Sequence, residues 1–144
     1  IIIVEAHQAN CYDRSFSNQT GEMEIVTGDL DSMMAGLCCG APNTRAFRIL
    51  TQYASASFSL HDRIAALGMR ILGNPLKDDP KIVSGESGAG VATGLLYFLQ
   101  ENDENNVKKE LGLDESSRVL CINTEGDTDR AHYRDIVWRG LYSL

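Results

Sequence analysis

Two stretches decide the fold of this chain: IVSGESGA at Ile82–Ala89 and VLCINTEGDTD at Val119–Asp129. In each stretch, apolar residues give way to small and polar residues just before a segment with helical character. Each is therefore read as a junction between a strand and a helix, the place where open α/β sheets hold ligands. The sequence predicts a ligand site at these two junctions.

Strands and helices alternate along the chain, which is typical of the α/β class. We expect strands at residues 1–5, 22–26, 57–60 (a short strand or a turn) and 118–122. We expect helices at residues 6–17, 32–37, from 43 onward, 62–72, 91–100, 104–111 and 129–138. The strand at 118–122 has a continuous apolar run, so it is predicted to be central and buried on both faces.

The first junction has two interpretations. A helix N-terminus offers unpaired N–H groups and the positive end of the helix dipole, which favour an anion. Gly85 and Gly88 would let such a ligand approach the backbone closely. Alternatively, Ser84 is only an N-cap, with Glu86 and Ser87 in the first turn of the helix.

The second junction also has two interpretations. Polar residues at the carboxyl end of the strand would face a crevice, where Thr124 could donate or accept a hydrogen bond. The alternative is a plain strand–turn–helix connection in which Asp127 or Thr128 is the N-cap.

Composition and charge narrow the classes of function. The net charge of −7 over 144 residues, without a local cluster of Lys and Arg, argues against a nucleic-acid partner. No segment approaches the roughly 20 apolar residues of a membrane span, so we expect no membrane partner. The cysteine and histidine spacings fit no metal site, and thiols that stay reduced suit a cytoplasmic protein.

The chain begins inside the apolar run Ile1–Val4, so we expect it to be part of a longer enzyme.

Several motifs together resemble diaminopropionate ammonia-lyases. They are Thr27–Asn43 (TGDLDSMMAGLCCGAPN), Ala65–Pro75 (AALGMRILGNP), Ile82–Ala89, Thr124–Asp129 (TEGDTD), His132–Arg134 and Val137–Trp138. The motifs follow in order over nearly the whole chain. The resemblance covers the C-terminal third or so of that family's chain.

The resemblance implies a cofactor, pyridoxal 5'-phosphate (PLP), and a fold. The fold is α/β, a three-layer open sheet with flanking helices, as part of a tryptophan synthase β-like (fold type II PLP) domain. Residues 1–144 would be the C-terminal part of a PLP-dependent lyase, mostly its larger cofactor-binding domain. The implied reaction is α,β-elimination of 2,3-diaminopropionate, a small amino-acid substrate, to pyruvate and ammonia, in a homodimer.

In that family the Schiff-base lysine, the phosphate loop and the acid/base residues lie upstream. We therefore expect no catalytic residue in this chain and no activity from the chain alone. None of its lysines, Lys77, Lys81, Lys108 and Lys109, has the sequence context of a cofactor lysine.

Three residues take cofactor-binding roles from the resemblance. Thr124 matches the hydroxyl residue that bonds the pyridine nitrogen, and Glu86 matches an acidic residue that flanks the cofactor in related dehydratases. Ser87, beside Glu86, is expected to bind the cofactor with them. Asn123 departs from the family pattern, which often has Ser at that position.

The resemblance also implies a disulfide between Cys11 and Cys39 near the entrance of the active site. Cys38 is an alternative partner for Cys11, and a third possibility is that all the thiols are free.

Two alternative functions stay open. The chain could be part of another fold type II dehydratase or lyase, because residues upstream mainly set substrate choice. It could also be a regulatory or assembly module that keeps the fold without the chemistry.

Overall fold

The computed structural model describes residues 1–103 and 106–143. The chain forms two compact units, Ile1–His61 (unit 1) and Asp62–Leu144 (unit 2). Among the described residues, no helix has the length and apolar character that crossing a membrane requires.

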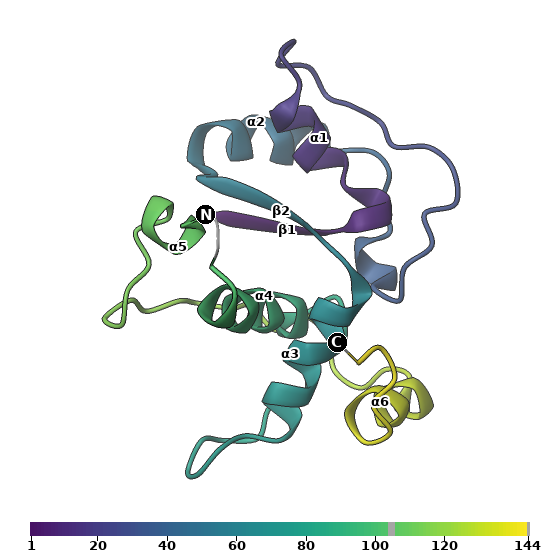
Figure 1. Cartoon of the computed structure of the whole chain (residues 1–144). Helices are drawn as coiled ribbons and strands as arrows, with labels where there is room; N and C mark the ends of the chain where they lie inside the picture. Colours follow the sequence, from purple (N-terminus) through teal and green to yellow (C-terminus); the bar gives the residue numbers. More distant parts are fainter. Residues whose placement is uncertain (104–105, 144) are drawn as a thin grey trace. The chain divides into compact units, whose positions relative to one another are not determined.

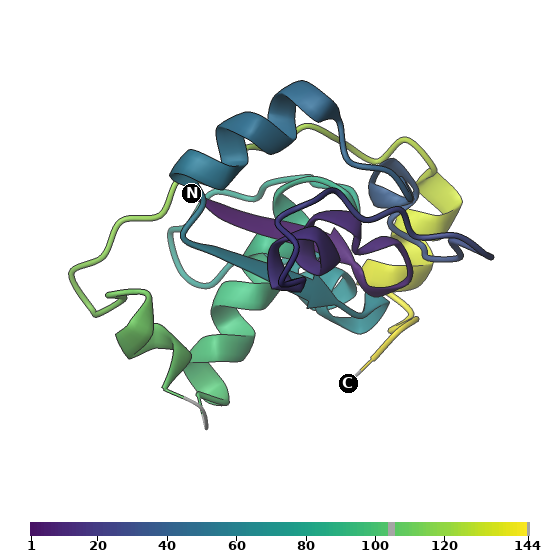
Figure 2. The ribbon, with the colours of Figure 1, turned by 90° about the horizontal axis from the view of Figure 1, so that it is seen from above.

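Unit 1 is built on two parallel strands, β1 (Ile2–Ala6) and β2 (Ala56–Leu60), which run side by side (Figure 1, Figure 2). The register pairs Ile2 with Ala56 and Ala6 with Leu60. Parallel strands need a long crossover connection. Here it carries the 3₁₀ turn η1 (His7–Ala9), α1 (Cys11–Ser17), the 3₁₀ turn η2 (Ala35–Leu37) and α2 (Thr44–Tyr53). The α/β class and the two strands expected at 1–5 and 57–60 are confirmed.

A buried carboxylate joins β1 to α1. Glu5 accepts hydrogen bonds from the backbone N–H groups of Tyr12 (3.0 Å) and Asp13 (2.7 Å), at the start of α1. Burial raises the pKa of Glu5, and the two backbone bonds partly offset that rise. Negative charge is favourable at a helix N-terminus, so Glu5 fixes where α1 begins relative to the strand.

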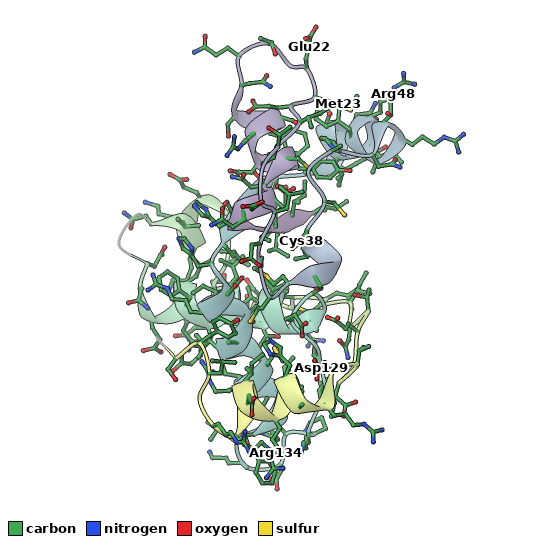
Figure 3. The ribbon with its side chains drawn as sticks, turned by 90° about the vertical axis from the view of Figure 1, so that its right-hand side faces the viewer. Glu22, Met23, Cys38, Arg48, Asp129 and Arg134 are labelled. Carbon is green, nitrogen blue, oxygen red and sulfur yellow. The ribbon has the colours of Figure 1, made fainter. Side chains whose placement is uncertain are left out.

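Three expectations for unit 1 need correction. Residues 22–26 are not a strand: Val26 N–H donates to the Gly40 carbonyl at 2.7 Å, while Met23 and Ile25 remain exposed. Figure 3 shows Met23 on the loop that follows α1. The helix expected over 6–17 is broken at Asn10, and the one expected over 32–37 is only the turn η2.

Unit 2 is helical over its described residues. It contains α3 (Asp62–Gly73), α4 (Ala89–Glu101), α5 (Val107–Glu110) and α6 (Arg130–Val137). The helices expected at 62–72, 91–100 and 129–138 are confirmed with small shifts of their ends. The helix expected at 104–111 is confirmed in part as α5, and its first two residues lie outside the described residues.

Helices α3 and α4 cross with their backbones almost in contact. A Cβ atom on Gly68 would overlap the carbonyl oxygen of Gly90, and one on Gly94 would overlap the carbonyl oxygen of Ile64. Close approach of two backbones requires residues without side chains. These glycines therefore set the position of α4.

Helix α6 is held to α3 through Arg70. The guanidinium donates to the carbonyl oxygens of Ile136 (3.3 Å), Leu141 (3.1 Å) and Tyr142 (3.3 Å), at and beyond the end of α6. A cation suits the last carbonyls of a helix. Ile136 and Val137 are buried, as the sequence predicts.

The buried strand expected at 118–122 is wrong. These residues have no strand assignment, and Leu120 and Ile122 are 88% and 72% exposed. A strand buried on both faces needs a paired strand on each side and a layer above and below. No such neighbours occur among the described residues.

We expect Gly68→Ala to lower the free energy of unfolding by about 1 kcal/mol overall, because overpacking usually costs about 2 kcal/mol. The better helix propensity of Ala, worth about 1 kcal/mol, opposes this loss without cancelling it. Urea unfolding followed by circular dichroism measures the difference. Gly126→Ala is the matched control, because its Cβ would meet no atom. A Gly68→Ala protein as stable as the parent would contradict the close crossing.

We expect the Cys11 thiol to react far more slowly than the Cys39 thiol in the reduced protein. Burial, and then the Glu5 carboxylate, raise the pKa of Cys11 to about 11, whereas Cys39 is exposed. Iodoacetamide at about pH 8, near the ordinary pKa of a thiol, followed by peptide mapping, gives the order of labelling. Equal labelling rates would show that Cys11 is not held in the buried site beside Glu5.

Candidate functional site

The two junctions predicted from the sequence lie against each other in unit 2. The Gly85 N–H donates to the carbonyl oxygen of Glu125 at 3.0 Å. The side-chain amide of Asn123 donates to the carbonyl oxygen of Val83, also at 3.0 Å. Backbone and side-chain bonds thus join segments far apart in the sequence.

The carboxylate of Glu125 lies at the entrance to α4. One of its oxygens accepts a hydrogen bond from Ser87 N–H at 2.7 Å, and Asn123 Oδ1 accepts a longer one, 3.5 Å, from Ala89 N–H. A carboxylate is favoured here by the orphan N–H groups and the positive end of the helix dipole. The helix start, which one of the two interpretations gave to an outside anion, therefore holds the protein's own Glu125.

Two glycines make room for this arrangement. A Cβ atom on Gly85 would lie 2.5 Å from the Glu125 carboxyl group, and one on Gly88 would lie 2.8 Å from Asn123 Oδ1. The glycines of the first junction therefore make room for side chains of the second junction.

Ser84 joins two backbone groups of the first junction through its hydroxyl group. It is fully buried, and its hydroxyl oxygen accepts from Gly90 N–H at 2.9 Å while donating to the Gly85 carbonyl at 3.0 Å. The expectation that Ser84 is the N-cap residue is wrong in position, because α4 begins at Ala89 with Gly88 as its N-cap. The Ser84 hydroxyl still caps an N–H in the first turn.

Glu86 is half-buried beside other charged residues. Burial raises its pKa most, and the negative charges of Glu125 and Asp129 raise it further, while His132 lowers it. A carboxyl group with a raised pKa can hold a proton closer to neutral pH than an exposed one. The Glu86 carboxyl group is therefore easier to protonate than an exposed carboxyl group.

Thr124 lies between the two residues that bind the first junction. It is exposed, and within the described residues its hydroxyl group has no hydrogen-bond partner. Asn123 and Glu125 hold the backbone on either side of it. The exposed hydroxyl group of Thr124 is thus available to a ligand.

The start of α6 differs from expectation. Asp129 is the N-cap, and one of its carboxylate oxygens accepts from the N–H groups of Ala131 and His132 at 3.0 Å each (Figure 3). Asp127, one of the two expected caps, instead forms an exposed ion pair with Arg130 at 3.7 Å. Thr128, the other, is not the cap either.

Cys11 and Cys39 are neighbours in unit 1 and are not joined in the structure. Both carry free thiols, and Cys11 Sγ donates to the carbonyl oxygen of Cys39 at 3.2 Å. Their pairing stays a prediction.

Comparison with known proteins gives the junctions a context. No family model matches the chain. Diaminopropionate ammonia-lyase of Escherichia coli K12 is 44% identical over 146 residues, which cover 99% of this chain. The chain is similar to diaminopropionate ammonia-lyases. The relative from Salmonella typhimurium LT2 is 46% identical over 142 residues and 97% of this chain.

The chain spans about a third of the length of these curated relatives, 35% in each case. Solved structures show the same similarity. E. coli diaminopropionate ammonia-lyase in complex with an aminoacrylate–PLP azomethine reaction intermediate has a TM-score of 0.88 at 42% identity, over 99% of this chain and 35% of that one. The same enzyme in complex with D-serine has a TM-score of 0.86 over 98% of this chain and 34% of its own.

A more distant neighbour supports the fold alone. The L-serine ammonia-lyase of the fungus Rhizomucor miehei has a TM-score of 0.72 at 21% identity, over 98% of this chain and 40% of that one.

The structure assigns importance to one residue that sequence reasoning did not single out. Glu125 supplies both a backbone and a side-chain acceptor to the first junction. A glutamate in a polar turn carries no sequence signal for a partner 38 residues away. In the sequence, only Gly85 and Gly88 indicated that another group lies close to the backbone of the first junction.

We expect Glu125→Ala to destabilise the protein by about 1.5 kcal/mol, because a charge-assisted hydrogen bond and its helix-dipole interaction are lost. Chemical unfolding of the purified chain measures this. Glu115→Ala, which removes an exposed carboxylate from a turn of the same unit, controls for the change in net charge. If the Glu125→Ala and Glu115→Ala proteins were equally stable, the position assigned to Glu125 would be contradicted.

Proposed function

We propose that this chain is part of a PLP-dependent ammonia-lyase that eliminates ammonia from 2,3-diaminopropionate to give pyruvate. The observation that carries the proposal is 44% identity to the E. coli diaminopropionate ammonia-lyase over 99% of the chain. Because the chain corresponds to about a third of that protein, the activity is assigned to the whole polypeptide.

The residues present fit the cofactor. Thr124 offers an exposed hydroxyl group without a partner among the described residues, the kind of group that bonds a pyridine nitrogen. Glu86 and Ser87 lie in the junction that is bonded to the residues flanking Thr124. We therefore assign these three residues to cofactor binding.

The cofactor, when bound, supplies the electron sink that the elimination needs. Thr124 would hold the ring nitrogen through its neutral hydroxyl group. Glu86 would hold or release a proton at its carboxyl group, for which its raised pKa suits it. The bonds of Glu125 and Asn123 keep the Thr124 turn in one position.

The rest of the assignment rests on the resemblance. We assign the parallel pair of unit 1 to a three-layer open sheet of fold type II, within the larger cofactor-binding domain. Its enzyme would be a cytoplasmic homodimer. The chain's lysines stay unassigned to the Schiff base, and the Lys108 ammonium group instead donates to the carbonyl oxygen of Gln100 at 3.5 Å.

The test is a chimera in which this chain replaces the matching third of the E. coli enzyme. We expect it to bind PLP and to release pyruvate with two ammonia per turnover from 2,3-diaminopropionate. Thr124→Ala should weaken cofactor retention roughly fivefold, the value of about one neutral hydrogen bond. Thr124→Ser should restore it, and Thr128→Ala, an exposed threonine of the same segment, should leave it unchanged.

Other results would redirect the assignment. Turnover of serine without turnover of 2,3-diaminopropionate would keep the cofactor and contradict the substrate. A folded chimera that binds no PLP would favour a module without chemistry. If the Thr124→Ala chimera retained the cofactor as well as the unmutated chimera, Thr124 would not be a cofactor-binding residue.

A further inference from the structure

Two histidines follow the two strands of unit 1 directly. The register pairs Ala6 of β1 with Leu60 of β2, so the next residues, His7 and His61, continue it side by side. Their rings lie with centroids 4.3 Å apart and planes tilted by 42°. Both residues are exposed. Parallel pairing has thus brought two imidazoles 54 positions apart into contact at the carboxyl edge of the strands.

A third side chain orients one of the rings. His7 Nδ1 and the Ser59 hydroxyl oxygen are hydrogen-bonded at 2.9 Å. When Nδ1 carries the proton and donates it to Ser59, Nε2 has a free lone pair. Histidines that bind metals commonly use this arrangement, in which one nitrogen is held by a neighbour and the other meets the ion. Ser59 lies in β2, next to Leu60, so the sheet itself fixes this contact.

We propose that His7 and His61 form a two-imidazole binding site for a first-row transition metal ion. Imidazole nitrogens bind such ions at about 2 Å, so two rings that share one ion must lie close to each other, as these do. Imidazole suits Cu²⁺, Ni²⁺ and Zn²⁺, with affinity highest for Cu²⁺ among the divalent ions. The chain's net charge of −7 favours a cation.

The site has two protein ligands and open positions. Among the described residues, no group of three or more His, Cys, Asp and Glu is arranged for a metal ion. Water or a bound small molecule would complete the coordination. Neither histidine belongs to the junctions assigned to PLP, so the proposal is independent of the proposed function.

Titration calorimetry with Ni²⁺ on the purified, reduced chain tests the proposal. Ni²⁺ avoids the oxidation of thiols that Cu²⁺ causes. We expect one ion per chain in the parent protein, with affinity reduced at least about tenfold in His7→Gln and in His61→Gln. Ser59→Ala should weaken binding about tenfold although both ligands remain, as removal of such an outer partner does. Circular dichroism confirms that each variant is folded.

His132→Gln is the matched control. The chain has three histidines, and His132 lies in α6 with its ring 6.0 Å from that of Tyr142, without a second imidazole. Its replacement should leave Ni²⁺ affinity unchanged. The proposal is overturned if the His7→Gln and His61→Gln proteins bind Ni²⁺ like the parent, or if the parent binds no more tightly than a protein that carries both substitutions.

Discussion

The hydrogen bond between the Glu125 carboxylate and the Ser87 N–H is the interaction on which unit 2 depends. It places a negative charge where the helix dipole and the unpaired N–H groups of α4 most favour one. It also joins the two segments that the sequence marks as junctions. Without it, the Ser87 N–H just before α4 would lose its acceptor, and the turn that carries Thr124 would have only the Asn123 contacts and one backbone bond to hold it.

Gly90 connects this hydrogen-bonded junction to the pair of helices α3 and α4. A Cβ atom at Gly90 would lie 2.8 Å from the carbonyl oxygen of Gly85 and 2.9 Å from the side chain of Met69. Gly90 therefore touches the first junction on one side and α3 on the other. The Ser84 hydroxyl binds its N–H as well. The position of the Thr124 turn is thus coupled to the crossing of α3 and α4.

Sequence reasoning found the elements whose signals are local. The apolar spacing in 62–72 and the apolar run in 91–100 were enough to predict α3 and α4, and the Gly–Asn–Pro stop at residue 73 marks the end of α3. The rule that ligands gather where strands meet helices singled out two segments that pack against each other, but no strand precedes either one among the described residues, and the ligand site stays a prediction. It could not indicate that Glu125 fills the first one, because that contact depends on how distant segments pack.

The failed predictions share this physical cause. The run at 118–122 has the composition of a buried strand, but burial requires neighbours that the described residues do not supply. The alternation at 22–26 resembles an edge strand, yet the Val26 N–H is bonded to the Gly40 carbonyl in a loop. For α6, three consecutive polar residues can each cap a helix, and only the backbone geometry selects Asp129.

The most direct test of the account is amide hydrogen exchange at Gly85 and Ser87, measured residue by residue by NMR on the purified chain. If Glu125 joins the two junctions as described, both amides exchange only when unit 2 unfolds, at rates close to those of buried α4 amides such as Leu95. Exchange of Gly85 and Ser87 as fast as that of the exposed Thr128 amide would contradict it, because the junctions would then not be held together in solution.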